Sequence, residues 1–265
     1  MIRAQLPTDD PNALTVLQSV GPRMTKLVRR DGSVESYGNA LYYAAAPVYV
    51  GTPDALITLL TSLSARPKCC VVPGAIVKGA NRAKMRRLQN KCPKTGDEAT
   101  LFDVPRYVFA LDFDGENIAV PDGLLRRDLL ASASVVRGVL PEPFHHAFCV
   151  AAATSSYLLK PGLRFRLWFR FDRPLTCGEM WRWMRPVNLP IDLSTFHANG
   201  ISYTAAPVFE NPAQDPLPDG RIVVIPGEPT VTAPSAESLK PPEYAPRGPV
   251  VASPYYGFSV LEREL

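Results

Sequence analysis

The chain has 265 residues, of which 46% are hydrophobic, and its formal net charge is +4. This length allows one large domain or two small ones, and the hydrophobic fraction is sufficient to fill a core. No apolar span is long enough for a membrane helix, and the N-terminus lacks a signal-peptide pattern, so we expect a cytoplasmic protein with no membrane partner. The mild positive charge is compatible with nucleic acid as a partner without requiring it.

The first half of the chain is expected to alternate strands with helices. A short strand is predicted over 48–50, and the Thr-Pro-Asp sequence at 52–54 is typical of a helix start. Residues 69–77 have the composition of a strand interrupted by proline and glycine. Residues 80–91 are predicted as a helix, and 107–114 as a strand.

The second half is expected to contain a hairpin between helices. Helical spacing of leucine and valine predicts a helix over 122–138. Strands are predicted over 148–154 and 163–171, separated by a Lys-Pro-Gly turn. A capping box predicts a helix over 176–185, and a last long strand is expected over 201–209. This pattern indicates an α+β fold.

Prolines are frequent from Asn211 onward, which excludes long helices and central strands there. A short extended segment is predicted over 221–225. We expect one folded domain within residues 1–230 and a proline-rich tail or linker over 231–265.

The five cysteines are odd in number and form no Cys-x-x-Cys pair, which favours reduced, buried thiols. Cys69, Cys70 and Cys92 with a histidine match no spacing of structural zinc sites, so zinc is not expected.

Two aspartates end the strand predicted over 107–114. Asp112 and Asp114 are two residues apart, so on a strand they project from the same face, while Leu111 and Phe113 turn toward a core. Neighbouring carboxylates repel each other, and a hard cation such as Mg²⁺ or Mn²⁺ between them removes that repulsion. The alternative is a strand end that leads both acids into solvent before Gly115.

The strand predicted over 163–171 alternates between an apolar face and a cationic face. Leucine and phenylalanine occupy the odd positions, and the even positions are Arg164, Arg166, Trp168 and Arg170. Arginine offers bidentate geometry to phosphate oxygens. A solvated charged face is the alternative. Together with Asp112 and Asp114, and with Asp192 as a third carboxylate further along, this strand is consistent with a metal–triphosphate site.

These motifs resemble the three motifs of the archaeo-eukaryotic primase superfamily, in the same order. The closest likeness is to primase-polymerase domains of phage, plasmid and mobile-element replication proteins. The resemblance covers about residues 70–225 and includes the stretches 157–169, 171–174 and 203–209. It implies a primase-like (RRM-like) core with a central mixed or antiparallel sheet flanked by helices.

The resemblance also implies an activity: DNA primase or polymerase chemistry, a nucleotidyl transfer that makes or extends primers on single-stranded DNA. Two Mg²⁺ or Mn²⁺ ions, nucleoside triphosphates (ribo- or deoxy-) and a replicative helicase module are the implied cofactors and partners. Asp112, Asp114 and Asp192 correspond to the catalytic metal ligands. Arg164 and Arg166 replace the Ser and His of the second motif and, with Arg170, are expected to bind nucleotide phosphates.

Ser155 and Ser156 are further candidates for phosphate binding, and capping of a turn is their alternative. The best candidates for template contact are Lys78, Arg82, Lys84, Arg86 and Arg87, on the helix predicted over 80–91 and its flank. A solvated cationic helix is the alternative. Trp168, on the arginine face, is expected to stack on a base.

Three other classes of protein fit parts of the sequence. A haloacid-dehalogenase-like phosphatase also ends a strand in Asp-x-Asp-Gly, with Asp112 as nucleophile, but Glu116 follows the glycine here. A replication-initiator endonuclease would use His145 and His146, whose adjacency points them to opposite faces of a strand. A catalytically inactive nucleic-acid-binding module is the third, because the Ser-x-His pattern is missing.

Overall fold

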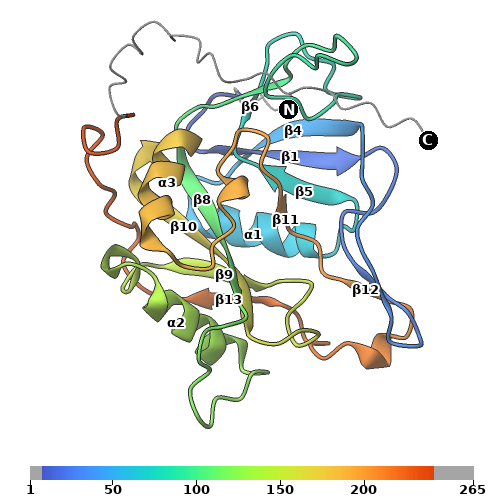
Figure 1. Ribbon diagram of the computed structural model, residues 1–265, viewed down its shortest axis with the longest axis vertical. Coiled ribbons are helices and arrows are strands. Elements are labelled where there is room, and N and C mark those ends of the chain that lie inside the picture. The colour runs from blue at the N-terminus through green and yellow to red at the C-terminus, as the bar shows by residue number, and fades with distance from the viewer. Residues whose placement is uncertain (1–7, 242–265) are drawn as a thin grey trace, which may run out of the picture.

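The computed structural model describes residues 8–241 and has a mixed α+β fold with several antiparallel sheets and few helices (Figure 1). Two sheets of four strands dominate it. The first sheet has the order β11 (Ser202–Tyr203), β5 (Cys69–Val72), β1 (Ala13–Ser19) and β4 (Tyr43–Tyr49). The second sheet has the order β13 (Ile222–Ile225), β9 (Cys149–Ala153), β10 (Leu163–Leu175) and β8 (Arg106–Gly115). All neighbouring strands in both sheets are antiparallel.

Smaller elements connect and cover these sheets. The remaining strands are β2 (Leu27–Val28), β3 (Val34–Glu35), β6 (Ala75–Ile76), β7 (Leu101–Phe102) and β12 (Val208–Phe209). The α-helices are α1 (Pro53–Ser64), α2 (Leu129–Val139) and α3 (Cys177–Met184). Single turns of 3₁₀-helix occupy Glu142–Phe144, Arg185–Val187, Leu193–Thr195 and Pro212–Gln214. None of the helices in 8–241 has the length and apolar character that crossing a bilayer requires.

The helix starts follow from local capping chemistry. The Thr52 hydroxyl accepts a hydrogen bond from the Ala55 N–H at 3.2 Å, as the sequence predicts. The expected capping box of Thr176 and Glu179 is present at the start of α3. The helix predicted from residue 122 begins only at Leu129, because the Asp128 side chain caps it there.

The second sheet is buried on both faces. Its outer face packs on α2 and α3 through Phe165, Leu167 and Phe169, and Figure 1 shows both helices on the side turned away from the first sheet. On its inner face, Trp168 shares an apolar cluster with α1 and with Leu14 and Val71 of the first sheet. The even positions Arg164, Arg166 and Trp168 of β10 are therefore buried, in contrast to the solvated-face alternative.

Two elements predicted from sequence are wrong. Residues 80–91 do not form a helix: they run along the edge of β4, where Met85 and Tyr43 exchange backbone hydrogen bonds of 2.8 Å. The backbone hydrogen bonds to Tyr43 take the place of helical hydrogen bonds in this weakly apolar segment. Burial of the Met85 side chain against the first sheet stabilises this arrangement. Residues 201–209 are two short strands in different sheets, since the Thr25 hydroxyl binds the Ala205 and Ala206 carbonyls between them at 3.1 and 3.0 Å.

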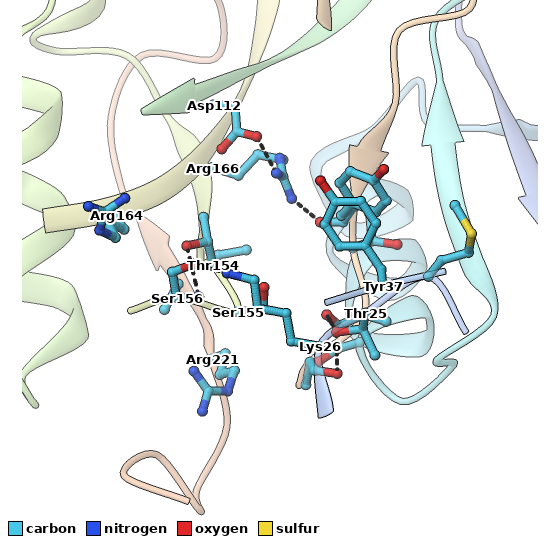
Figure 2. Close-up of a pocket in the computed structure, with 18 of the residues that line it drawn as sticks. Thr25, Lys26, Tyr37, Asp112, Thr154, Ser155, Ser156, Arg164, Arg166 and Arg221 are labelled. Atoms are coloured by element: carbon cyan, nitrogen blue, oxygen red, sulfur yellow. Dashed lines mark hydrogen bonds and ion pairs between the residues drawn. The ribbon is translucent and has the colours of Figure 1, made fainter. Parts of the chain in front are cut away.

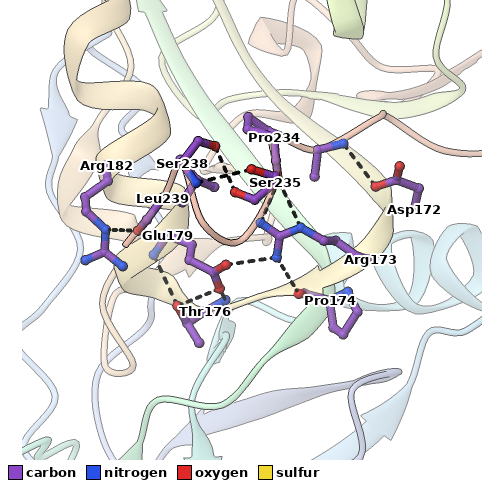
Figure 3. Close-up of polar contacts among 11 residues, drawn as sticks. Asp172, Arg173, Pro174, Thr176, Glu179, Arg182, Pro234, Ser235, Ser238 and Leu239 are labelled. Atoms are coloured by element: carbon purple, nitrogen blue, oxygen red, sulfur yellow. Dashed lines mark hydrogen bonds and ion pairs between the residues drawn. The ribbon is translucent and has the colours of Figure 1, made fainter. Parts of the chain in front are cut away.

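After β13 the chain bonds first to His146 and Phe148 and then to β10, and it reaches α3 at Leu239 (Figure 3). The Arg173 guanidinium donates to the Pro234 carbonyl at 2.7 and 3.0 Å and pairs with Glu179 at 2.8 Å. Arg182 donates to the Leu239 carbonyl, and Val231 and Leu239 are buried. This part of the expected tail thus packs on the domain, and the rest of it, 242–265, lies outside the described residues.

A buried arginine secures the N-terminal segment. Arg106, at the start of β8, is fully buried and donates to three backbone carbonyls: Pro73 and Thr8 at 2.8 Å each, and Asp10. Burial lowers the pKa of Arg106 to about 10. Arg106 of β8 therefore fixes the position of the residues that lead into β1.

Trp168 is only 2% exposed, so it is a core residue and cannot stack on a base as expected from sequence. We predict that Trp168→Ala lowers the free energy of unfolding by about 3–5 kcal/mol, because it leaves a cavity between the two sheets. Urea unfolding followed by circular dichroism measures this. Leu125→Ala, at a side chain that is 76% exposed, is the control and should change stability by less than about 0.5 kcal/mol. Equal losses of unfolding free energy in both variants would contradict the assignment of Trp168 to the core.

Candidate functional site

The register of β8 against β10 brings acids and arginines together. Asp114 lies opposite Arg164, and Asp112 lies opposite Arg166. Side chains directly opposite in an antiparallel pair point to the same face, so all four project to the inner side of the second sheet. The predicted pairing of an acidic strand end with an arginine face is therefore present.

These residues form two ion pairs. Arg166 Nη2 contacts Asp112 Oδ2, and Arg164 Nη1 contacts Asp114 Oδ1. Arg164 also bonds Glu116 Oε2 at 2.8 Å. The arginine side chains are 5% and 6% exposed, whereas that of Asp114 is 63% exposed and that of Asp112 is 20% exposed. The guanidinium groups are thus the buried partners, and the carboxylates face the opening.

Asp192 lies beside this acidic strand end. The Asp192 N–H donates to the Asp112 carbonyl at 2.9 Å, and the Asp114 N–H donates to the Pro190 carbonyl at 2.8 Å. Residues 190–192 therefore extend the edge of the second sheet next to β8. One oxygen of the Asp192 carboxylate accepts from the Ser194 N–H at 2.9 Å and caps a 3₁₀ turn.

A pocket of about 220 Å³ opens between the two sheets at this end. The second sheet contributes the three aspartates, Arg164, Arg166 and the turn 154–156, and the other wall comprises Thr25, Lys26, Tyr37 and 203–206. Figure 2 shows Asp112, Arg166, Lys26 and Arg221 around this space, each from a different segment of the chain. Arg166 also donates to the Tyr203 carbonyl, so its guanidinium spans the gap between the sheets.

The pocket contains two cations that no motif in the sequence indicates. Lys26 Nζ donates to the Ser156 hydroxyl, and burial, followed by the charges of Lys160 and Arg164, lowers the pKa of Lys26. Arg221 is 3% exposed and pairs with Asp215. Within residues 8–241, its Nε and Nη1 atoms and the Nε of Arg166 are buried without a hydrogen-bond partner. Arg221 starts the extended segment predicted over 221–225, but no local pattern marks Lys26.

The predicted phosphate-binding residues divide into two groups. Ser155 and Ser156 line the pocket, as do Arg164 and Arg166. Arg170 does not: it donates to the Asn12 side chain at 2.9 Å and lies over the Tyr107 ring at 4.5 Å. The expectation for Arg170 is wrong because Trp168, buried between the sheets, separates it from the pocket along β10.

The predicted template-binding residues lie on the irregular segment between β6 and β7. Lys78, Arg82 and Lys84 are exposed, and Lys84 lies 4.8 Å from the centre of the Tyr42 ring. Arg86 pairs with Asp97 at 2.6 Å, and Arg87 donates to the Asn199 carbonyl. Three of the five cations therefore face solvent, while the other two have partners within the domain.

The acids at the end of β8 can hold a divalent cation only together with another ligand. Among the side chains described in 8–241, no three His, Cys, Asp or Glu groups are arranged to hold an ion. Asp112 and Asp114 nevertheless share one face, and each uses one oxygen in its ion pair. Mg²⁺ is usually held by one or two carboxylates together with substrate phosphates, so this pair fits the cation when phosphates complete its shell.

No protein-family model, curated protein or solved structure matches this chain. Any assignment of function to the chain therefore rests on its sequence motifs and on the geometry of the pocket.

Cys92, on the segment between β6 and β7, offers a pH-dependent test of that segment. Hydrogen bonds from the Thr95 hydroxyl and from the backbone of residues 94 and 95 lower the pKa of Cys92 to about 7. Because the thiolate is the reactive form, we predict that alkylation of Cys92 by iodoacetamide rises with pH to a midpoint near 7. Mass spectrometry measures the rate, and Cys70, buried with a pKa of about 12, should stay unmodified.

Thr95→Val is the matched variant for this experiment. Loss of the hydroxyl donor should move the midpoint upward, toward the ordinary thiol value of about 8.5. An unchanged midpoint would mean that the segment is not folded as described.

Proposed function

We propose that this chain is a DNA primase or polymerase that transfers nucleotides on a single-stranded template in a divalent-metal-dependent reaction. The proposal includes a primase-like core of the archaeo-eukaryotic type, and replication of a mobile element as its context. One observation carries it: Asp192, far along the chain from Asp112 and Asp114, lines one pocket with them and with buried arginines. No other chemistry suggested by the sequence uses all of these groups.

The cationic part of the pocket supports a triphosphate as the substrate. Arg164, Arg166, Arg221 and Lys26 all line it, and the Ser156 hydroxyl lies beside Lys26. Buried guanidinium N–H groups that lack partners are costly, and phosphate oxygens are strong acceptors for them. We infer that Arg166 and Arg221 orient the phosphates.

Asp112 and Asp114 would hold the divalent cations, with Asp192 as the third ligand once its carboxylate leaves the cap at Ser194. When bound, such ions lower the pKa of the attacking 3′-hydroxyl and neutralise charge on the departing pyrophosphate. The role of the protein is to hold the carboxylates on one rigid strand and to keep the arginines at its partner strand.

The exposed cations on the segment between β6 and β7 support a path for the template. This segment packs on the first sheet through Met85, and its Arg87 donates to the Asn199 carbonyl, just before β11. A single strand bound along Lys78, Arg82 and Lys84 would thus approach the pocket from the side of the first sheet.

A catalytically inactive nucleic-acid-binding module is the second candidate. The observation that favours it is that Asp112 and Asp114 are both paired with arginine. The assay for nucleotide incorporation separates the two candidates.

We predict that Asp112→Asn, Asp114→Asn and Asp192→Asn each reduce nucleotide incorporation by about 10³-fold, because each removes a negative charge from the reaction centre. The measurement is extension on a single-stranded DNA template, with and without primer, with ribo- or deoxynucleotides and Mg²⁺ or Mn²⁺. Asp122→Asn, on an exposed loop, is the control and should keep full activity. Any of the three variants that remains active removes its aspartate from the site.

We also predict that Arg82→Gln/Lys84→Gln weakens binding of single-stranded DNA and lowers the slope of log K against log [salt] by about 1.4, since two phosphate contacts are lost. Fluorescence anisotropy over a salt series measures both. Arg127→Gln/Lys240→Gln removes the same charge from exposed positions elsewhere and should leave the slope unchanged. Identical slopes in the two double variants would show that the segment does not contact the template.

A further inference from the structure

We propose that Arg164 and Arg166 are exchangeable partners of the two strand-end acids, so that the pocket accepts a divalent cation bound to a polyphosphate and discriminates against the free cation. This rests on the proposed function, because it concerns the same acids and the same phosphates. It adds a selection step that acts before any chemistry.

The first support is the one-to-one pairing. Each acid has its own arginine directly across the strand pair, and each arginine uses a terminal nitrogen to hold it. The two acids and two arginines together carry no net charge. A free cation therefore meets carboxylates that are already neutralised.

The second support is the asymmetry of burial. The arginine side chains are 5% and 6% exposed, whereas the acids reach the pocket opening. A free cation that takes the Asp112 carboxylate leaves the Arg166 guanidinium buried without a counter-charge. Removal of one partner from a buried ion pair is strongly unfavourable, so such binding must be weak.

The third support is that phosphate suits the arginines as a replacement partner. A guanidinium binds two phosphate oxygens at once, and the buried Nε of Arg166 lacks an acceptor among the described residues. A cation–polyphosphate complex supplies a positive centre to the acids and negative oxygens to the arginines in the same event. Both halves of each ion pair then exchange partners without leaving a buried charge alone.

The test measures binding of Mn²⁺ alone, by electron paramagnetic resonance of the unbound ion, in the absence of any nucleotide. We expect Arg166→Gln to bind Mn²⁺ about tenfold more tightly than the unaltered chain, because the Asp112 carboxylate is no longer paired with a guanidinium. The same variant should bind the Mn²⁺ complex of inorganic tripolyphosphate more weakly. Arg170→Gln, which removes an arginine that is paired with Asn12 rather than with an acid, should change neither affinity.

A double variant identifies the group responsible. Asp112→Asn/Arg166→Gln should lose the gain in Mn²⁺ affinity, since the uncovered carboxylate is gone. Arg164→Gln tests the same exchange at Asp114 if Arg166→Gln does not fold. Mn²⁺ affinity that is unchanged or weaker in the folded arginine variants overturns the proposal.

The outcome can be separated from that of the proposed function. Incorporation of nucleotides by the unaltered chain, with no gain in Mn²⁺ affinity in the arginine variants, refutes the exchange alone. A gain in Mn²⁺ affinity without any incorporation supports the exchange and refutes the polymerase.

Discussion

The pairing between β8 and β10 determines which charges meet in the pocket. A shift of one residue would turn the acids toward the outer core, and a shift of two toward the start of β8 would place Arg166 opposite Ala110. Glycines hold the open end of this pair in register: a Cβ on Gly162 would lie 2.3 Å from the Gly115 carbonyl oxygen, and one on Gly115 would lie 2.8 Å from the Leu163 carbonyl oxygen. The close approach that only glycine allows thus positions Asp114 and Arg164, which lie within two residues of these glycines.

Because the second sheet is buried on both faces, the arginines of these ion pairs are shielded from water. On the surface, an arginine–carboxylate pair contributes little to stability and exchanges readily with water. Here the arginines extend from a strand whose next inward residue, Trp168, is part of the cluster between the sheets. Arg166 also reaches the Tyr203 carbonyl of the first sheet. The charge that faces the pocket is therefore held by the same packing that joins the two halves of the fold.

Local patterns in the sequence predict the elements that carry the site, and they fail where distant partners decide. Alternation predicts β8 and β10, and side-chain oxygens predict the starts of α1 and α3. The helix expected over 80–91 is absent because Met85 pairs with Tyr43 of β4, which is distant in the sequence. Trp168 lies on the arginine face as predicted, but only the tertiary fold shows that this face is interior. Lys26, directly before β2, lines the pocket, and no sequence pattern around Lys26 indicates this position.

Arg106 ties the beginning of the described chain to the middle of the fold. Two of its three carbonyl acceptors belong to Thr8 and Asp10, before the first strand. A truncated protein that starts at Ala13 would keep every strand of both sheets and yet leave a fully buried guanidinium with the Pro73 carbonyl alone. The carbonyl groups of this short N-terminal segment therefore replace water around the buried Arg106 guanidinium, and removal of the segment would leave that cation with one of its three acceptors.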